Sequence, residues 1–236
     1  MLYIKVPESL GVRKLSFYLA LEEYVARSGK AGECLFIWQV SPSVIFGRHQ
    51  VLEQEVNVDF CRRHDIQLFR RKSGGGCVYA DLSNIMLSYV TSTGQVGLAF
   101  NSFVNMLLLV LRKLGVQAVG TAHNDIMIGD RKVSGTACYH VAGKSIVHGT
   151  LLYDTNMDYM TGALTPSASK LRSKGISSVR QRVTFLKDHT PLSIDEVKSV
   201  IRQTLCQDEL LLADQDIAAV EAIEQTYLRE QFIYQL

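Results

Sequence analysis

The chain has 236 residues, of which 20% are charged and 47% hydrophobic, and its formal net charge is +2. This composition excludes a disordered chain and argues against a general nucleic-acid binder. The N-terminus is too short and too polar for a secretory signal, and no apolar run is long enough to suggest a membrane span. Five cysteines are scattered without metal-ligand spacing, so we expect a soluble cytoplasmic protein with reduced thiols.

The first part of the chain predicts a short N-terminal strand, a helix, two strands and a short second helix. The helix and the elements after it are expected at residues 15–28, 34–38, 44–46 and 53–64. Gly29 is a plausible stop for the first helix. Trp38 and Arg48 could line a site, although the only tryptophan of a domain is more often part of its core.

Three consecutive glycines, at positions 74–76, follow a strand-like run at residues 66–70. Glycine has no Cβ, so these residues can turn their backbone N–H groups toward a ligand, and Arg70 and Arg71 add positive charge. The stretch therefore predicts a site for phosphate or carboxylate oxygens, with a tight turn and solvated arginines as the equally weighted alternative. It matches neither a dinucleotide fingerprint nor a P-loop. We expect residues 84–90 to form the strand that leaves this loop.

The middle of the chain combines a long helix with a hairpin. Apolar residues follow a 3.6-residue period over residues 100–114, which indicates core packing, and Gly115 ends the helix. A Gly-Asp turn at 129–130 opens a hairpin whose returning strand spans residues 131–139. The two-residue period places Lys132 on one face together with Ser134, Thr136 and Cys138. That face is either solvated or part of a site.

The last part of the chain adds a strand, a loop and two helices. Residues 145–153 alternate as a strand, on which His148 is either a core histidine or a ligand contact. Residues 165–182 are basic and lack a clean period, so they are either a functional lid or a plain exposed loop. A capping box opens a helix at residues 193–205, and a final helix starts at position 214 or 216. No linker marks a second domain.

Several blocks of sequence together resemble the lipoate–protein ligase A family. They are residues 19–23, 70–84, 124–126, 129–137, 148–152 and 174–183. The resemblance implies an α+β fold of the class II synthetase-like biotin and lipoate ligase type, with a mixed, largely antiparallel sheet flanked by helices. It also implies activation of lipoate or octanoate with ATP and Mg2+ to an acyl-adenylate, followed by transfer to a lysine of a lipoyl domain. The implied partners are acyltransferase subunits of 2-oxoacid dehydrogenases and the glycine-cleavage carrier protein.

The same resemblance implies roles for individual residues. Lys132 matches the catalytic lysine that contacts both the acyl carbonyl and the adenylate phosphate. Asn124 and Asp125 match a pair near the phosphate, with Asp125 at the metal. The other nucleotide-binding positions are Arg71, Gly74, Gly75, Gly76, Cys77, Val78 and Tyr79, and the other acyl-binding positions are Ser73, Gly75, Ala137 and His148. A fixed lysine and inward N–H groups would stabilise developing negative charge without a nucleophilic side chain. The basic loop is expected to close over the adenylate.

The sequence departs from the family pattern at three points, of which Ser83 in place of a common glycine is the minor one. Ala80 stands where the signature usually has histidine. The chain also ends about where the large domain of the family finishes, so we expect residues 1–236 to be one catalytic domain without the C-terminal accessory domain. Three possibilities then remain open. The chain needs a separately encoded small subunit, it is active by itself, or it performs only the transfer step.

Two other functions are weighed against the ligase. An ATP-independent octanoyl or lipoyl transferase would need a cysteine thioester. Cys138 lies roughly 20 Å along the strand from Lys132, which is too far for both to contact one carbonyl. Cys77 is better placed, but we interpret it as a packed thiol. A non-catalytic lipoate-binding paralogue would explain Ala80, but Lys132 and the intact glycines argue against it. A biotin ligase is disfavoured because its glycine-rich signature differs.

Overall fold

The structure is a computed structural model that describes residues 1–122, 125–165 and 182–235. Its centre is an eight-stranded sheet in which β1 pairs parallel with its two neighbours and the other pairings are antiparallel. In sheet order the strands are β11 (Asp208–Leu211), β1 (Leu2–Lys5), β2 (Glu33–Trp38), β6 (Asn84–Thr91), β10 (Lys144–Leu152), β9 (Arg131–Val141), β8 (Asp125–Ile128) and β7 (Val119–Gly120). The predicted mixed, largely antiparallel α+β fold is confirmed.

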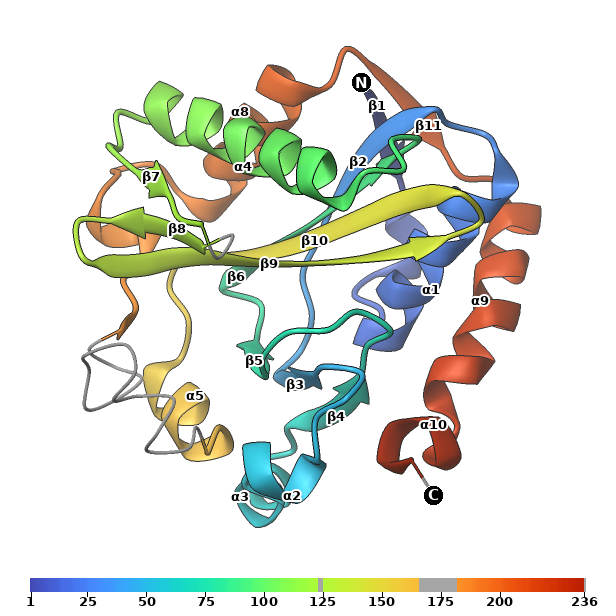
Figure 1. The fold of residues 1–236 in the computed structure, drawn as a ribbon, viewed down its shortest axis with the longest axis vertical. Helices are drawn as coiled ribbons and strands as arrows, with labels where there is room; N and C mark the ends of the chain where they lie inside the picture. Colours follow the sequence, from blue (N-terminus) through green and yellow to red (C-terminus); the bar gives the residue numbers. More distant parts are fainter. Residues whose placement is uncertain (123–124, 166–181, 236) are drawn as a thin grey trace.

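A second, three-stranded sheet lies below the large one (Figure 1). It consists of β4 (Gln67–Arg70), β3 (Ser43–Phe46) and β5 (Val78–Ala80), with β3 in the middle, parallel to β4 and antiparallel to β5. The strand that leaves the glycines is therefore β5, and the prediction that residues 84–90 take this place was wrong. Those residues belong to β6 in the large sheet, because a turn at Asp81–Asn84 redirects the chain.

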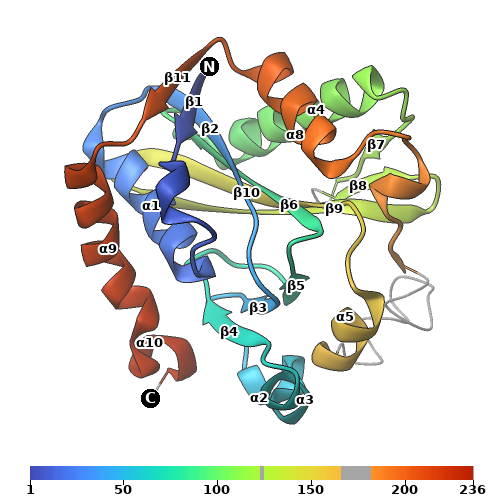
Figure 2. The same ribbon diagram turned by 180° about the vertical axis from the view of Figure 1, so that it is seen from behind.

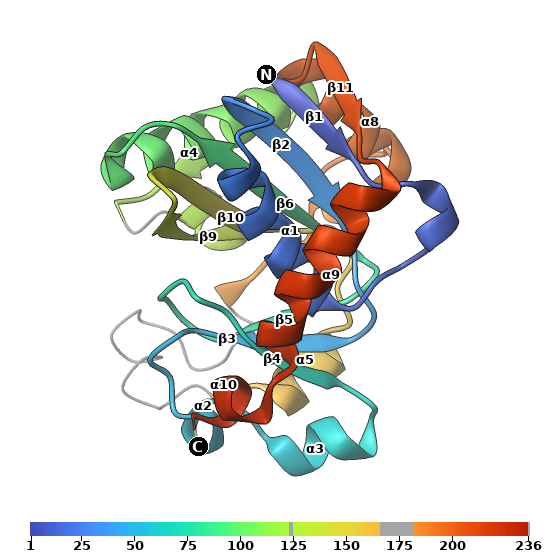
Figure 3. The same ribbon diagram turned by 90° about the vertical axis from the view of Figure 1, so that its right-hand side faces the viewer.

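Helices cover both faces of the large sheet (Figures 1 and 2). Helices α4 (Val96–Lys113) and α8 (Ile194–Leu205) lie on one face, and α1 (Leu15–Ser28) and α9 (Asp214–Leu228) lie on the other. Helix α9 runs from the large sheet toward the small one, where the short helices gather (Figure 3). The short elements are η1 (Glu8–Leu10), α2 (Leu52–Glu55), α3 (Val58–Arg63), α5 (Met157–Ala163), η2 (Leu186–Asp188) and α10 (Glu230–Tyr234).

Local sequence signals explain where several helices begin and end. Gly29 ends α1 in the left-handed conformation, with a φ of 66°, which glycine adopts without steric cost. Ser193 opens α8 with the predicted capping box. The helix predicted at residues 53–64 is instead two helices, because Val56 is extended and the Asn57 side chain accepts a hydrogen bond from the backbone of Phe60 to cap α3.

Helix α4 is the one described helix long and apolar enough to cross a membrane, judged by length and composition alone. Its buried residues, Ala99, Phe103, Leu107, Val110 and Leu111, pack into the apolar cluster over the large sheet. We therefore interpret α4 as a core helix, as the sequence predicted for residues 100–114.

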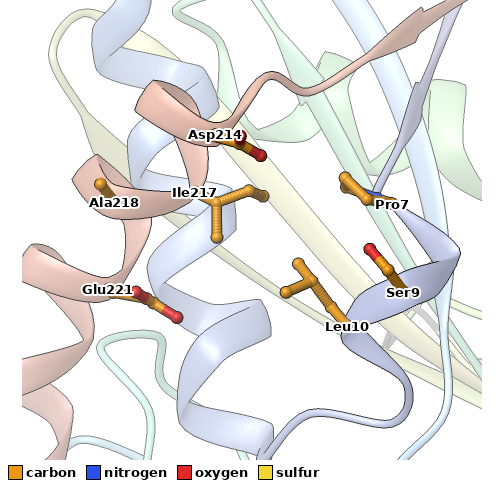
Figure 4. A pocket seen from close by; sticks show the side chains of 7 residues that line it. All are labelled: Pro7, Ser9, Leu10, Asp214, Ile217, Ala218 and Glu221. Atoms are coloured by element: carbon orange, nitrogen blue, oxygen red, sulfur yellow. The ribbon is translucent and has the colours of Figure 1, made fainter.

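Two hollows differ greatly in size. A pocket of about 130 Å³ lies between the turn after β1 and helix α9, with Leu10 and Ile217 facing each other across it (Figure 4). At about 30 Å³ per water it holds only a few solvent molecules. The other hollow has about 430 Å³, which falls in the range of sites for small organic ligands.

Candidate active site

The larger cavity lies between the two sheets and is bordered by neighbouring strands of the large sheet. Its lining comes from β2, β6, β10, β9 and β8, which are adjacent in that order. Four inter-strand spacings of about 4.8 Å give the cavity a reach of about 19 Å across the sheet. The small sheet, α1 and α5 complete it. The lining residues are Leu19, Trp38, Ile45, Glu55, Arg71, Gly76, Cys77, Val78, Tyr79, Met86, Asp125, Lys132, Gly135, Thr136, Ala137, His148, Gly149, Thr150, Leu152, Met160, Leu164, Arg182 and Val183.

The chemical character of the cavity changes along this line of strands. At β2 and β6 the walls are apolar, since Trp38 and Met86 are cross-strand neighbours in the same core cluster as Leu19 and Ile45. At β9 and β8 the walls carry Lys132 and Asp125. The cavity therefore suits an amphipathic molecule with an apolar body and an anionic head.

Lys132 reaches the cavity because β9 contains a bulge. Met127 pairs with Lys132 but Ile126 pairs with Ser134, so Val133 is the extra residue. The bulge shifts the alternation by one position. Lys132 consequently shares a face with Gly135, where a Cβ would fall on the lysine ammonium. The prediction that Lys132 shares a face with Ser134, Thr136 and Cys138 was wrong, because a strict two-residue period cannot anticipate a bulge.

Asp125 connects two cations at this end of the cavity. Its Oδ1 lies 2.7 Å from Lys132 Nζ, and its Oδ2 lies 3.3 Å from a terminal nitrogen of Arg182. Arg182 is brought there because Val183 bridges the backbone of Lys132 and the Thr184 amide donates to the Lys132 carbonyl. The arrangement fixes the direction of the Lys132 side chain.

Arg71 organises the glycine stretch from inside. The guanidinium is buried and donates to the carbonyls of Ile45, Gly74 and Gly76, and its Nε donates to Ser73 Oγ at 2.9 Å. Burial lowers its pKa to about 10. In this structure Arg71 shapes the loop, and its predicted contact with a nucleotide stays a prediction.

The neighbouring cations are likewise held by the protein. Arg70 donates to the carbonyls of Gly47, Arg48, Gln50 and Ile233. Gly47 must be a glycine, because a Cβ there would come within 2.5 Å of the Gly75 carbonyl oxygen. The alternative of solvated arginines at residues 70–71 is not found, because both guanidinium groups are buried.

Lys72 ties the same loop to the helices. Its ammonium lies 2.5 Å from a Glu23 carboxylate oxygen and 4.9 Å from the centre of the Tyr227 ring. Burial alone raises the pKa of Glu23, but hydrogen bonds from Lys72 and Arg27 outweigh it, and the pKa is lowered overall. The loop is therefore anchored to α1 and α9.

The structure places most predicted site residues around the cavity. Those in the lining are Arg71, Gly76, Cys77, Val78, Tyr79, Asp125, Lys132, Ala137 and His148. Ser73, Gly74 and Gly75 do not belong to the lining that the described residues form, and they lie directly behind it in contact with Arg71. Asn124 and most of the predicted basic loop, residues 166–181, fall outside the described residues. None of the predicted roles is tested by position alone.

Sequence reasoning missed Glu22 and did not resolve Trp38. The Glu22 carboxylate is fully buried and lies 3.0 Å from Nδ1 of His148. The available signal was the acidic pair Glu22–Glu23 in the middle of a mostly apolar helix. Trp38 is both a core residue and part of the lining, so the two interpretations offered for it were not exclusive.

The polar end of the family signature has a structural role in this chain. Asp81 accepts hydrogen bonds from the backbone amides of Ser83 and Asn156, and Asn84 donates to the Tyr79 carbonyl. Ala80 is fully buried on the α1 side of β5. The turn after β5 is thus held by the Asp and Asn of the signature.

The fold and the cavity define the chain as an α+β domain whose cavity suits a small amphipathic ligand. Residues 14–206 match the family model of the lipoyl protein ligase A/B catalytic domain. The chain therefore belongs to this family, as the sequence blocks indicated.

Curated relatives agree with this assignment. The chain is 37% identical over 213 residues to lipoate–protein ligase 1 of Staphylococcus aureus, covering 87% of this chain and 65% of that protein. It is 34% identical to lipoate-protein ligase A of Psychrobacter cryohalolentis, covering 91% of this chain and 63% of that protein. The chain spans 52% to 66% of the length of the curated relatives that it matches.

Solved structures resemble the chain over its whole length. A Thermoplasma acidophilum protein with bound lipoic acid has a TM-score of 0.83 at 26% identity, covering 100% of this chain and 98% of that one. A lipoate-protein ligase A bound with ATP has a TM-score of 0.81 at 26% identity, covering 100% and 98%. A bi-partite T. acidophilum lipoate protein ligase, described with its E2 lipoyl domain, has a TM-score of 0.82 at 28% identity, covering 99% and 95%.

Proposed function

We propose that this chain is the catalytic part of an ATP-dependent lipoate–protein ligase. It would activate lipoate, or octanoate, to acyl-AMP and transfer the acyl group to a lysine of a lipoyl domain. The observation that carries the proposal is one continuous cavity with apolar walls at β2 and β6 and Lys132 at β9. A saturated acyl chain fits the first part, and a carboxylate or phosphate fits the second.

Lys132 is the proposed catalytic residue. Asp125 and the backbone of Val183 hold its side chain and main chain in place, so little reorganisation is needed when negative charge develops nearby. In activation the ammonium would stabilise charge on the α-phosphate as the acyl carboxylate attacks it and pyrophosphate leaves. In transfer it would polarise the acyl carbonyl while AMP leaves. Both steps use the same fixed positive charge.

The glycine stretch is the proposed nucleotide-binding element. Gly76 and the residues of β5 line the cavity, while Arg71 and Lys72 hold the stretch from behind. Backbone N–H groups from Gly76 to Tyr79 would bind the nucleotide, and Arg71 would act mainly by keeping their positions. His148 and Ala137 are proposed to contact the acyl substrate.

The residues present fit a magnesium ion only when substrate phosphates complete its ligands. Among residues 1–122, 125–165 and 182–235, no group of three His, Cys, Asp or Glu side chains could hold a metal. Mg2+ usually binds one or two carboxylates together with phosphate oxygens and water. Asp125 is the carboxylate we assign to it, and the ion would add positive charge beside the phosphates.

The expected acceptors are lipoyl domains of 2-oxoacid dehydrogenase acyltransferase subunits and the glycine-cleavage carrier protein. We propose that residues 1–236 form one catalytic domain that acts in the cytoplasm. The five free cysteines support a reducing compartment. A separately encoded accessory subunit is included in the proposal because one structural neighbour is described as bi-partite.

The test measures the mass of a lipoyl-domain acceptor together with pyrophosphate release. The purified chain is incubated with lipoate and acceptor, with and without Mg-ATP, and in parallel with synthetic lipoyl-adenylate. ATP-dependent modification supports a self-sufficient ligase. Modification from the adenylate alone indicates a catalytic part that needs an accessory subunit. Tight lipoate binding without either reaction would contradict the proposal and favour a binding paralogue.

A thioester transferase is the second candidate because Cys77 lines the cavity. The structure gives this thiol no activation, since burial raises the pKa of Cys77 to about 12. Burial also raises the pKa of Cys138 to about 11, and Cys138 packs against the cluster on the α4 side of the sheet. The thiolate is the nucleophilic form of cysteine, so neither residue supports this candidate.

A further inference from the structure

A chain of hydrogen bonds runs along the cavity from its apolar end to the glycine stretch. It crosses from the large sheet to α1 and back, and these elements lie side by side in Figures 1 and 3. Its members are, in order, Trp38, Ser88, Glu22, His148, Ser73 and Arg71. Every member is buried. Water therefore does not compete for these hydrogen bonds, and each group donates to or accepts from a defined neighbour.

The first half of the chain fixes the Glu22 carboxylate. Trp38 Nε1 donates to Ser88 Oγ at 2.9 Å, and Ser88 Oγ donates to Glu22 Oε1 at 2.6 Å. An indole nitrogen can only donate, so the Ser88 hydroxyl must accept from it and pass its own hydrogen to Glu22. The carboxylate is then oriented toward Nδ1 of His148, which lies 3.0 Å from both of its oxygens.

The second half of this hydrogen-bond chain is satisfied by one tautomer of His148. Arg71 Nε always donates, and it lies 2.9 Å from Ser73 Oγ. Among the described residues the Ser73 hydroxyl hydrogen has one acceptor within hydrogen-bond distance, His148 Nε2 at 2.7 Å. The hydroxyl is therefore satisfied when Nε2 accepts and the ring proton lies on Nδ1, facing Glu22. Donor at Nδ1 and acceptor at Nε2 is the arrangement that satisfies both neighbours.

Arg71 connects these hydrogen bonds to the glycine stretch. The same guanidinium that donates to Ser73 also donates at 2.7 Å to the carbonyls of Gly74 and Gly76. Gly75 between them has a φ of +91°, which only glycine adopts readily. The conformation of this stretch thus depends on the position of a side chain that Ser73 and His148 hold.

We propose that Glu22 is a positioning residue that sets the geometry of the glycine stretch through His148, Ser73 and Arg71. The proposal rests on the proposed function for its catalytic consequence, because the glycine stretch is assigned there to the nucleotide. Glu22 contacts neither the reacting atoms nor the stretch directly. Its role is to keep His148 in the tautomer that accepts from Ser73.

The Ser73, His148 and Glu22 arrangement also resembles the hydrogen-bond pattern of a serine hydrolase. Ser73 is only 1% exposed, and it does not belong to the cavity lining of the described residues. Its oxygen is also occupied by Arg71 Nε. These contacts favour a positioning role over that of a nucleophile, so we assign the three residues to positioning.

The first test is the tautomer of His148 in the full chain. Ring-nitrogen NMR of histidine-labelled protein, with the signal assigned by His148→Gln, should show the proton on Nδ1. In Glu22→Gln an amide nitrogen can donate to Nδ1, so the Nε2–H form should become populated. An unchanged tautomer in Glu22→Gln would overturn the proposal, as would an imidazolium or Nε2–H form in the unsubstituted chain.

The second test does not depend on activity. The Arg48 amide donates to the Ser73 carbonyl at 3.0 Å, and its hydrogen exchange should accelerate about tenfold in Glu22→Gln and in Ser73→Ala, which corresponds to the loss of one hydrogen bond of about 1.4 kcal/mol. Ser73→Ala should leave the His148 proton on Nδ1, because it removes the hydrogen bond at Nε2 and keeps the contact between Nδ1 and Glu22. Asp216→Asn is the matched control, a buried acid on α9 that contacts Tyr24 and Lys30. Unchanged exchange in both variants would contradict the role of Glu22.

The third test follows pyrophosphate release or, if the chain does not activate lipoate, transfer from lipoyl-adenylate. Glu22→Gln should lower kcat about 10- to 100-fold with little change in KM for lipoate. The Glu22→Gln and Ser73→Ala double variant should be no worse than the poorer single variant. Additive losses of kcat in the double variant, or a change confined to KM for lipoate, would mean that Glu22 only shapes the pocket and does not position the glycine stretch. If both reactions fail in the unsubstituted chain, the proposed function fails, while the tautomer and exchange tests still decide the role of Glu22.

Discussion

The two faces of the large sheet are built from the same strands but differ in chemistry. On β6, Ile85, Leu87 and Tyr89 point into the cluster under α4 and α8, while Ser88 points toward Glu22 on the other face. The α4 face is an apolar core. The α1 face buries an arginine, a histidine and two glutamates around a cavity.

This difference shows where the fold is stabilised and where it is adapted to a ligand. Burying a charge is costly unless every donor and acceptor is satisfied. The α1 face meets this cost with a connected set of hydrogen bonds, which the α4 face does not need. Substitutions should therefore distinguish the two faces. We expect losses of activity mainly on the α1 face and losses of stability on the α4 face.

The largest expected effect is that of Lys132→Ala on activity. We expect a loss of about 100- to 1000-fold or more in adenylation and transfer, because a fixed positive charge beside the reacting group is removed. The thermal unfolding midpoint should stay close to that of the unsubstituted chain. Lys113→Ala, an exposed lysine at the end of α4, is the control. Near-normal turnover by Lys132→Ala would contradict the proposed mechanism.

On the opposite face, Leu107→Ala should affect stability alone. The residue is fully buried under α4, and such truncations lower the free energy of unfolding by about 2–5 kcal/mol. Activity per folded molecule should be unchanged. The matched variant Leu109→Ala, at a position 44% exposed on the same helix, should change stability by less than about 0.5 kcal/mol. A selective loss of kcat in Leu107→Ala would break the comparison.

A smaller effect, dependent on pH, is expected for Glu23→Gln. The pKa of Glu23 is lowered in the folded protein, so its contribution is present above the unfolded value of about 4.3 and is lost as pH falls through the folded value. Chemical denaturation from pH 7 to pH 3 should show a destabilised variant at neutral pH and a shrinking difference in acid. The exposed Glu230→Gln is the control. A difference independent of pH would show that the Lys72 contact contributes little.

The smallest effects are expected for Cys77→Ser and Cys138→Ser. Both thiols have raised pKa values, about 12 and about 11, because of burial. Each variant should keep activity within a few-fold in the lipoyl-domain modification assay. Complete loss in either one would shift the conclusion to a thioester mechanism.

The sequence predicted those elements whose causes are local. The capping box of α8, the glycine stop of α1 and the 3.6-residue period of α4 all lie within the segment they determine. The hairpin of β8 and β9 follows from its Gly-Asp turn. Such signals need no knowledge of distant residues, and for these elements the structure confirms them.

The sequence could not predict features that depend on distant partners. The pairing of β3 with β4 and the two roles of Trp38 arise only in the folded chain. The bulge that turns Lys132 toward Gly135 is an insertion relative to β8, so its position depends on the pairing partner. Arg70 and Arg71 were recognised as important, but their carbonyl partners lie up to 163 residues away.

The contact between Arg70 and the Ile233 carbonyl has a consequence for biosynthesis. Arg70 also holds the 47–50 turn that packs on Gly75. During translation, Ile233 is made 163 residues after Arg70, which corresponds to roughly 10 to 30 s at 5–20 residues per second. Until α10 emerges from the ribosome, one donor of a buried guanidinium lacks its acceptor. A nascent chain would therefore acquire a finished ligand site only after α10 has been made, which delays ligand capture until this helix has docked.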